Sequence, residues 1–455
     1  MNATFDEAQA WAQNEFGGAR LGDRRRTRRV VRVAAALGRC PSGTLPSALR
    51  HWKELKGAYR LFSNQGVSYP AILESHCRRT EVACRQPGEY LLIEDRTILD
   101  YSSHRATRGL GRIGNDRGAG FLLHTTLAVK VEAERAVKVV GLLGQRCWAR
   151  TGSSARAKKE RWRQRVSRPR ESEHWAGVFR KLERVPEPAR WIYVADRESD
   201  IYEVFERCGA AGVEFIVRAQ FARALAQEDR SVFEAVASAP RLGRFELELR
   251  TRGDAPARRA QLEVRTYRAR LRGVWRPEGM RPDLEVNIVE VREAATSGIH
   301  WVLVSSLPCE NFEACRGIVA RYARRWLIEE YHKALKSGAN VEASQLESAQ
   351  GLQALLGILA VVAVRLLNFK LLARSQPLRK VDAELLGAEE LALLTREFGQ
   401  PKEGWTYGNV LVAIARMGGF LARTGDGSPG WLTIWRGWQQ LSLMAHGART
   451  LNSTE

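Results

Sequence analysis

The chain has 455 residues, and its 72 Lys and Arg residues exceed its 51 Asp and Glu residues by enough to give a formal net charge of +21. This length is too great for one hydrophobic core and predicts roughly two to four domains. The charge argues against a small acidic substrate and favours a polyanion such as nucleic acid as the partner.

The cysteines and the apolar runs indicate in which cellular compartment the protein works. The seven cysteines are scattered with no C-x-x-C pair, so neither a disulfide framework nor a zinc site is indicated. The N-terminus lacks the basic flank and apolar core of a signal peptide, and the longest apolar run, 354–364, is too short to cross a bilayer. We therefore expect a cytoplasmic protein with no membrane partner.

Residues 5–80 show helical patterns broken by Gly and Pro turns, which predict a small all-α unit. Within it, Asp23 or Gly22 can cap a helix whose first turns carry a run of arginines. Cations packed so closely repel one another unless an anion is near, so Arg25, Arg26 and Arg29 are expected to contact the DNA backbone. The alternative is an exposed basic face with no partner.

From about residue 90 the pattern changes to strands. Apolar runs at 90–95, 120–130 and 136–144 have short links and predict an antiparallel meander. Two further strands, at 191–195 and 213–218, enclose a helical segment. The middle of the chain is therefore predicted to be α/β.

The remaining chain divides into three parts. Residues 219–299 alternate short β-like runs with Gly, Pro and Arg turns, as an inserted β-rich part would. A strand at 300–306 and a buried helix over 353–370 are expected to return the chain to the α/β sheet. From 380 onward, helical segments predict a C-terminal α-helical part.

Two of the predicted strands end in a carboxylate, namely Asp95 and Asp196. Acids at the ends of neighbouring strands, with a third from a helix packed on the sheet, form the oxygen cage that Mg²⁺ or Mn²⁺ prefers. Each Asp alone is a weak signal, because acids often end strands or cap helices. Glu94, Glu198 and Asp200 are rival ligands that the sequence leaves open.

A third acid lies in a helical stretch with basic and aromatic residues. At about 100° per residue, one helix face would carry Tyr322, Arg325, Glu329, Lys333 and Lys336. Glu330 falls off that face, so Glu329 is the better candidate for a functional carboxylate beside Arg325, Lys333 and Lys336. The alternative is a solvated, salt-bridged helix surface.

These residues together resemble the DDE transposases of bacterial insertion sequences, and in particular the transposon-five transposase family. That family's signature is Tyr, two residues, Arg, three residues, Glu, six residues and Lys. It is met by Tyr322, Arg325, Glu329 and Lys336. Shorter matches, including the arginine run after Asp23, extend the resemblance over nearly the whole chain.

The resemblance implies an α/β fold with a ribonuclease-H-like catalytic core, a β-rich insertion and helical parts at both ends. The implied domains are a DNA-end-binding domain over 1–75, a catalytic core over 76–218 and 300–372, the insertion over 219–299, and a synapsis or dimerisation domain over 373–455.

The resemblance also implies roles for particular residues. Asp95, Asp196 and Glu329 would be the metal-binding catalytic triad. Phosphates near the cleaved end would be held by Arg218, Tyr322, Arg325, Lys333 and Lys336. Trp301 would stack on a base flipped out of the DNA, with a core Trp in a strand as the alternative.

The implied function is cut-and-paste transposition: hydrolysis, hairpin formation, reopening and joining to target DNA, with Mg²⁺ or Mn²⁺ as two ions. The partners would be double-stranded DNA at the transposon ends, target DNA and a second copy of the chain, in the bacterial cytoplasm at the nucleoid. A plain metal-dependent nuclease of the same fold and a non-catalytic DNA-binding regulator are the alternatives.

Overall fold

The structure is a computed structural model of the whole chain. It describes residues 7–41, 44–114, 117–132, 136–150, 171–249, 258–293, 298–383 and 385–452. The chain divides into two compact units. The first unit comprises Met1–Ala83, Arg96–Ala157 and Glu329–Glu455, and the second comprises Cys84–Asp95 and Lys158–Ile328. The chain therefore passes from one unit to the other inside a strand, at residue 95, and inside a helix, at residue 328.

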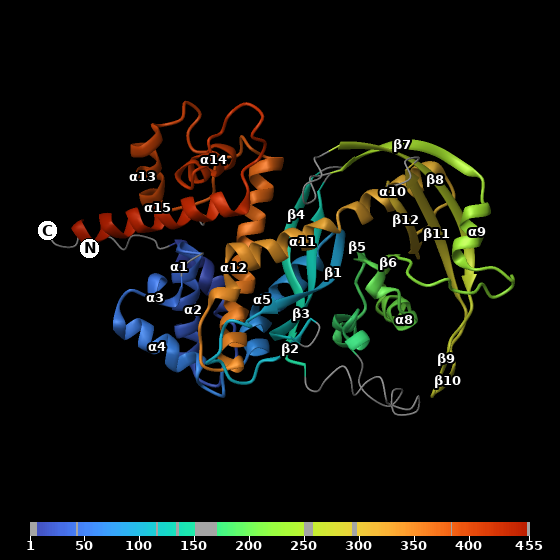
Figure 1. Cartoon of the computed structure of the whole chain (residues 1–455), viewed down its shortest axis with the longest axis horizontal. Helices are drawn as coiled ribbons and strands as arrows, with labels where there is room; N and C mark the ends of the chain where they lie inside the picture. The colour runs from blue at the N-terminus through green and yellow to red at the C-terminus, as the bar shows by residue number, and fades with distance from the viewer. Residues whose placement is uncertain are drawn as a thin grey trace. The chain divides into compact units, whose positions relative to one another are not determined.

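The first unit contains most of the helices (Figure 1). Its helices are α1 (Glu7–Phe16), α2 (Arg24–Arg39), α3 (Leu45–Ala48), α4 (Trp52–Phe62), α5 (Tyr69–Cys84), the π-helical turn η4 (Ala334–Gly338), η5 (Val341–Ala343), α12 (Ala349–Ser375), α13 (Ala388–Phe398), α14 (Tyr407–Met417) and α15 (Trp431–Asn452). Its strands are β2 (Gly111–Ile113), β3 (Gly118–Val131) and β4 (Val137–Trp148). β2 and β4 both pair antiparallel with β3.

Helix α2 begins where the sequence predicts. The side chain of Asp23 caps it by accepting a hydrogen bond of 2.8 Å from the backbone N–H of Arg25. Val30, Val33 and Leu37 recur at helical spacing and are buried, and α2 packs on α1, α4 and α12. The arginines of its first two turns lie on the remaining surface, so the amphipathic pattern explains both faces of the helix.

Helix α12 is the core of the first unit. It begins at the cap of Ser348, whose hydroxyl accepts a hydrogen bond of 3.1 Å from Gly351, and it packs on α2, α4, α14, β4 and η4. In the part of the chain that the structure describes, α12 is the one helix long and apolar enough to cross a membrane, but 89% of its most apolar window is buried inside the protein. A core helix has these same properties, as the sequence predicted for 353–370.

The second unit is built on a mixed sheet. Its strand order is β1, β5, β6, β12, β11, β8, β7, with bounds β1 (Gly88–Asp100), β5 (Ala189–Ala195), β6 (Glu214–Arg218), β7 (Arg241–Leu249), β8 (Arg258–Leu271), β11 (Leu284–Glu293) and β12 (His300–Ser305). β9 (Trp275–Arg276) and β10 (Gly279–Met280) form a separate hairpin. The helical elements are η1 (Glu171–His174), η2 (Gly177–Lys181), η3 (Arg197–Ser199), α8 (Tyr202–Ala211), α9 (Val232–Ser238), α10 (Phe312–Ala323) and the start of α11 (Trp326–Lys333).

The centre of this sheet is parallel and its far side is antiparallel. β1 pairs with β5, and β5 with β6, in parallel, whereas β12, β11, β8 and β7 pair antiparallel in turn. α9 lies against β8 and β11 (Figure 1). The predicted α/β class, with a β-rich segment before the return strand and with helical ends, is confirmed.

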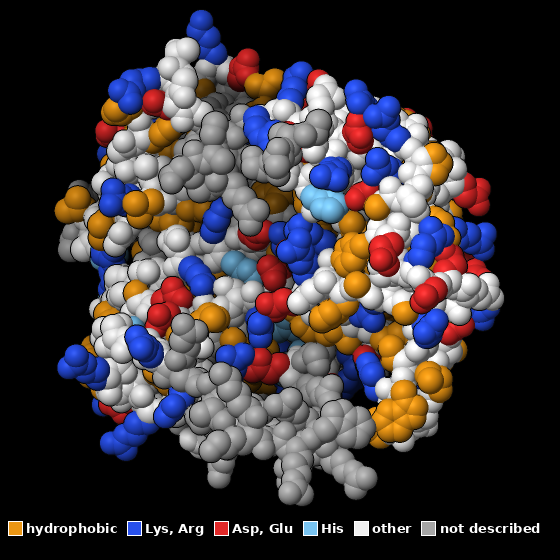
Figure 2. Space-filling view, turned by 45° about the vertical axis from the view of Figure 1, so that its right-hand side comes forward, with side chains coloured by type: hydrophobic (Ala, Val, Ile, Leu, Met, Phe, Trp, Pro, Cys, Tyr) orange, Lys and Arg blue, Asp and Glu red, His pale blue; other side chains and the backbone are white. Residues whose placement is uncertain are grey.

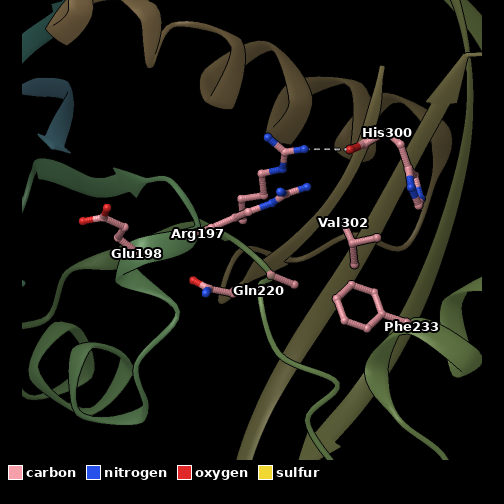
Figure 3. A pocket seen from close by; sticks show the side chains of 8 residues that line it. Arg197, Glu198, Gln220, Phe233, His300 and Val302 are labelled. Atoms are coloured by element: carbon pink, nitrogen blue, oxygen red, sulfur yellow. Dashed lines mark hydrogen bonds between the residues drawn. The ribbon is translucent and has the colours of Figure 1, made fainter. Parts of the chain in front are cut away.

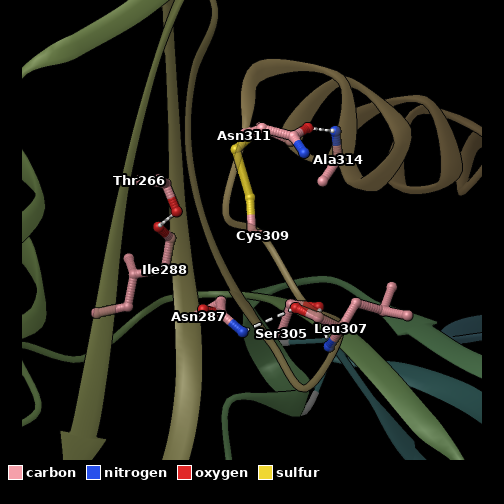
Figure 4. The surroundings of a disulfide bond; sticks show 9 residues. Thr266, Asn287, Ile288, Ser305, Leu307, Cys309, Asn311 and Ala314 are labelled. Carbon is pink, nitrogen blue, oxygen red and sulfur yellow. Dashed lines mark hydrogen bonds between the residues drawn. A yellow bond between two sulfur atoms is a disulfide. The ribbon is translucent and has the colours of Figure 1, made fainter.

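One disulfide was not expected from the cysteine pattern. Cys309 and Cys315 are bonded, with their Cα atoms 5.4 Å apart. Figure 4 places this bond at the turn between β12 and α10, beside Asn311, whose side chain caps α10. The spacing matches no common motif, and only the turn at the start of α10 brings the two residues together.

Candidate active site

The parallel pairing of β1 with β5 brings the two predicted aspartates next to each other. In the pairing of β1 with β5, Ile93 lies opposite Val194 and Glu94 opposite Ala195. Asp95 and Asp196 are the next residues in the chain. β1 continues to Asp100, so Asp95 lies inside that strand and does not end it as the sequence predicted, whereas Asp196 directly follows the end of β5. The parallel register nevertheless brings the two carboxylates side by side, because each follows a residue of the pair Glu94 and Ala195.

The guanidinium of Arg325 lies between these two carboxylates. Its Nη1 is 3.7 Å from Oδ2 of Asp95, and its Nη2 is 3.7 Å from Oδ2 of Asp196. The Arg325 side chain is only 15% exposed. Two acids of like charge thus share one cation, which offsets their mutual repulsion.

Asp196 has further partners. It caps the turn η3 through a hydrogen bond of 2.8 Å from the backbone N–H of Arg197. Nη1 of Arg218 is 3.8 Å from its Oδ1, and the hydroxyl of Tyr322 donates to that same oxygen over 3.3 Å. Burial, together with the charge of Asp196, raises the pKa of Tyr322, so this phenol stays a neutral donor.

Trp301 contacts the same cluster from strand β12. Its ring meets that of Tyr322 edge to face, with the centroids 5.0 Å apart, and the residue is partly exposed. Arg218, opposite Leu303 across the β6 and β12 pairing, donates from Nη2 to the carbonyl oxygen of His300 over 3.0 Å. Four of the predicted DNA-contacting residues, Arg218, Trp301, Tyr322 and Arg325, are therefore gathered within the second unit around Asp196.

Two of the rival acids have structural partners. Glu94 is 2% exposed and accepts hydrogen bonds from the hydroxyl of Tyr193 and, over 2.8 Å, from the backbone N–H of Ala176. Asp200 is buried and accepts from the backbone of Gln220 and Phe221. Strand alternation explains the first case, because a side chain next to Asp95 on a strand points to the opposite face.

Asp200 also accepts a hydrogen bond of 2.6 Å from Nε of Arg223.

The third rival acid, Glu198, lines a pocket beside the site. That pocket, of about 500 Å³, is lined by Arg197, Glu198, Arg218, Ala219, Gln220, Phe233, His300 and Val302. Figure 3 shows Arg197, Gln220, Val302 and Phe233 around this pocket. His300, also labelled there, accepts the hydrogen bond from Arg218 at its backbone carbonyl oxygen.

The signature stretch is helical but is not one continuous α-helix, so the uniform steps of 100° from which the shared face was predicted do not hold along it. α10 ends at Ala323, a turn covers Arg324 and Arg325, and α11 runs from Trp326 to Lys333. The chain then widens into the π-helical turn η4. Both breaks change the angle between successive residues, and such irregular turns are frequent at functional sites.

The later part of the signature belongs to the first unit. Glu329 lies in the first turn of α11 and is partly buried. Lys333 is exposed and its ammonium is 3.3 Å from Oε1 of Glu330. Lys336 lies in η4, 3.7 Å from Glu342. The role of Glu329 as the third acid stays a prediction.

The arginines at the start of α2 differ in their surroundings. Arg25 is 88% exposed and pairs with Asp23. Arg26 donates to the carbonyl oxygen of Leu21 over 3.0 Å, and Arg29 is bonded to Glu54. Arg24, Arg28 and Arg32 are also exposed and lie four residues apart, so they share one helix face. In Figure 2, Lys and Arg side chains are spread over the whole visible surface, as the net charge requires.

Sequence reasoning missed two contacts that support the site. One is the buried bond between Tyr193 and Glu94. The other joins Arg321, just before Tyr322, to Glu89 on β1 through hydrogen bonds of 2.8 and 2.7 Å. Neither has a local signal, because the partners lie 99 and 232 residues apart in the chain.

The donor set around Arg325 fits a hard divalent cation. Asp95 and Asp196 supply oxygen only and already converge on one positive charge, so the guanidinium stands where a metal ion would be attracted. Among the described residues, no three His, Cys, Asp or Glu side chains are grouped closely enough to hold a metal ion together. Within the second unit, the structure brings together Asp95 and Asp196, two of the three expected ligands.

Comparison with known families covers most of the chain. Residues 8–67 match the transposase DNA-binding family, residues 171–365 the transposase DDE domain, and residues 361–455 the transposase Tn5 dimerisation domain. The chain belongs to the Tn5-like DDE transposases. Its reaction is therefore DNA cleavage and strand transfer, with one domain that binds DNA and one that dimerises. Enzymes of this family generally use divalent metal ions.

Among solved structures, the transposase is similar to a piggyBac transposase synaptic complex with hairpin DNA. The identity is 10% and the TM-score 0.34, over 85% of this chain and 70% of that one.

Proposed function

We propose that this transposase excises an insertion sequence by cut-and-paste chemistry, with Asp95, Asp196 and Glu329 as its catalytic triad. The observation that carries the proposal is the convergence of Asp95 and Asp196 on the single guanidinium of Arg325, both within 3.7 Å. Two acids held this close together are costly unless a cation lies between them. The match of the DDE domain over 171–365, which contains Asp196 and Glu329 but not Asp95, supports a catalytic role for this part of the chain.

The metal would be Mg²⁺ or Mn²⁺, bound as two ions that activate a water or a 3′-hydroxyl and stabilise the leaving oxygen. Asp95 and Asp196 would supply oxygen ligands from neighbouring strands, and Glu329 the third from α11. Arg325 would leave the carboxylates and turn to a phosphate of the DNA, because a guanidinium binds phosphate as well as carboxylate.

The other cations would grip the DNA end. Arg218 and Tyr322 already contact Asp196, so they would lie beside a phosphate that is cut there. Lys333 and Lys336 would add charge from α11 and η4. Trp301 would break its edge-to-face contact with Tyr322 and stack on a base flipped out of the DNA. The pocket lined by Arg197 and Arg218 would bind the adjoining sugar-phosphate backbone of the DNA.

The DNA-end-binding surface would centre on α2, within the proposed domain 1–75. Arg25, with Arg24, Arg28 and Arg32, offers exposed guanidinium groups. Arg26 and Arg29 are expected to contribute less than the sequence suggested, because each already has an internal partner.

The proposed core, 76–218 and 300–372, would carry the insertion 219–299, and 373–455 would join two copies in a synaptic complex. We place the enzyme in the bacterial cytoplasm at the nucleoid, where its DNA substrate is found.

The test is incubation of the purified protein with labelled DNA that carries its element's terminal inverted repeat, with and without Mg²⁺. Nicks and hairpins at the element boundary, absent with Asp196→Ala, are expected on a denaturing gel. Bound but uncut DNA would favour a regulator, and cutting without boundary specificity would favour a plain nuclease.

A further inference from the structure

Glu330, the residue after Glu329, is the acceptor of three side chains from three helical elements. Its Oε2 lies 3.2 Å from Nζ of Lys370 on α12 and 3.1 Å from Nε1 of Trp431 on α15. Its Oε1 lies 3.3 Å from Nζ of Lys333 on α11 itself. The Glu330 side chain is 15% exposed and that of Lys370 only 6%. The carboxylate is thus held from both sides of the helix in a poorly hydrated place.

The partners of Glu330 also bind one another. Nζ of Lys370 lies 4.1 Å from the centroid of the Trp431 ring, in cation–π geometry. Trp431 stacks on Trp435 one turn further along α15, with centroids 5.5 Å apart and planes 10° apart. The first turns of α15 therefore present a rigid aromatic pair to α11 and α12.

Trp435 continues the contact into the next turn of the signature stretch. A Cβ atom added at Gly338, the last residue of η4, would lie 2.0 Å from the Trp435 ring. Such a distance leaves room for no residue but glycine at this position. The aromatic pair Trp431 and Trp435 thus touches the signature stretch at Glu330, before the π-helical turn, and again at Gly338, the last residue of that turn.

We propose that Lys370 and the aromatic pair Trp431 and Trp435 form a brace that positions the helix bearing Glu329, so that the dimerisation region also sets the geometry of the active site. This rests on the proposed function, because it assumes that Glu329 is the third acid. Trp431 and Trp435 lie inside the matched dimerisation domain, 361–455. The domain that joins two copies is therefore in direct contact with the residue next to the proposed catalytic glutamate.

The electrostatics of the brace agree with its geometry. Burial lowers the pKa of Lys370 to about 8, and the charge of Glu330 works against that change. In turn Lys370, against the effect of burial, holds the pKa of Glu330 below its usual value. A buried pair of this kind adds little net stability but is costly to break on one side, so it specifies one arrangement of the helices.

The first experiment compares Trp431→Phe with Trp405→Phe. Each variant keeps an aromatic ring and loses one indole hydrogen bond, to Glu330 in the first case and to Thr395 over 2.9 Å in the second. Both tryptophans lie in the matched dimerisation domain, but the bond of Trp405 is made within that domain. We expect Trp431→Phe to slow cleavage of the labelled DNA by about tenfold or more at saturating Mg²⁺, since small misplacements of a catalytic group have effects of this size. Trp405→Phe should cut at the rate of the unaltered enzyme.

Two further readouts separate a brace from a general loss of structure. End binding and the dimer mass by light scattering should be unchanged in Trp431→Phe, while amide hydrogen exchange over residues 326–338 should become faster. Unchanged exchange over this stretch, or equal cleavage by the two variants, overturns the brace. If the unaltered enzyme does not cut DNA, the proposed function fails instead, and the exchange comparison still decides whether the brace exists.

A second pair of variants tests the charges. Lys370→Met leaves Glu330 buried without its main counter-charge and should slow cleavage. The double variant Lys370→Met with Glu330→Gln removes both charges of the pair and should recover most of the cleavage rate. A double variant that is slower than Lys370→Met would contradict the role of this ion pair as a positioning contact.

Discussion

Tyr193 and Glu94 share a buried hydrogen bond between the two strands that lead to Asp95 and Asp196. Tyr193 is fully buried on β5, and its hydroxyl also lies 2.7 Å from that of Ser199. Glu94 adjoins Asp95, and Ser199 closes the turn that Asp196 caps, with its N–H 3.0 Å from the Asp196 carbonyl oxygen. One phenol thus ties together the two chain segments that carry the carboxylates.

Tyr193→Phe should therefore weaken metal binding more than it weakens the fold. The variant loses a buried hydrogen bond, at a cost of about 1 to 3 kcal/mol in unfolding free energy, and frees Glu94 and Ser199 to shift. We expect the Mg²⁺ concentration for half-maximal cleavage to rise severalfold. Tyr407→Phe is the matched control, because it loses a phenol-to-carboxylate bond of 2.7 Å to Asp382. An equal Mg²⁺ requirement in both variants would reduce Tyr193 to a purely structural role.

Arg325→Ala should separate metal binding from catalysis. Without the guanidinium, Asp95 and Asp196 repel each other and attract a divalent ion more strongly. Calorimetry without DNA should then show tighter Mg²⁺ or Mn²⁺ binding, while cleavage falls because the proposed phosphate contact is lost. Weaker metal binding would mean that Arg325 organises the carboxylates and does not compete with the metal.

The exposed arginines of α2 should set the salt dependence of end binding. Each phosphate contact contributes about 0.9 to the slope of log affinity against log salt concentration. Arg24→Ala with Arg28→Ala should lower both the affinity and the slope, which a fluorescence titration would measure. Arg25→Ala with Arg26→Ala should also lower the affinity and the slope, and the loss of Arg25 should account for most of this effect. An unaltered slope in both double variants would move the DNA contact away from this helix.

Arg29→Ala should act on stability instead. Arg29 is bonded to Glu54 across α2 and α4, and both side chains are mostly covered. Loss of this partner should lower the melting temperature while leaving the salt slope nearly unchanged. A slope that falls as far as in Arg24→Ala with Arg28→Ala would restore Arg29 to the DNA-binding surface.

The outer face of α15 should carry the dimer contact. Its exposed apolar residues are Leu432, Leu443, Met444 and Leu451, within the matched dimerisation domain. Leu443→Glu with Leu451→Glu should shift the mass in light scattering toward the monomer and reduce paired-end cutting. Leu421→Glu, exposed but outside α15, is the control. Equal dimer content in the two proteins would place the interface elsewhere.

The proposed insertion, 219–299, should lose stability as the pH falls below 4.5. A hydrogen bond from Arg258, with another from the backbone of Ile299, lowers the pKa of Glu293 to about 2. Because the folded pKa lies below the ordinary 4.5, this pair stabilises the fold fully above pH 4.5 and loses that contribution as the pH falls toward 2. Glu293→Gln should flatten the pH dependence of the melting temperature in this window. A curve as steep as that of the unaltered protein would exclude this carboxylate as a source of acid sensitivity.

The amino-acid sequence by itself determined the nucleic-acid partner, the helical ends and the α/β middle. It also singled out Asp95 and Asp196, although Asp95 lies inside β1 (Gly88–Asp100) and not at its end. The partner class follows from the net charge of the whole chain. The helices and strands follow from apolar periodicity, which depends on residues close together in the sequence and not on contacts with distant segments. The capped arginine helix α2 is such a case, since Asp23 and the spacing of Val30, Val33 and Leu37 specify both its start and its buried face.

Tertiary structure alone decided which neighbouring acids face the site and what holds them there. Glu94 and Asp95 are neighbouring carboxylates that the sequence could not rank as ligands. The pairing of β1 with β5 brings Glu94 to Tyr193 and Asp95 to Arg325. The break between α10 and α11, the bond of Cys309 with Cys315 and the contact of Glu330 with Trp431 were likewise hidden. The last of these joins residues 101 positions apart, and such contacts arise from packing between distant segments, for which a local pattern carries no signal.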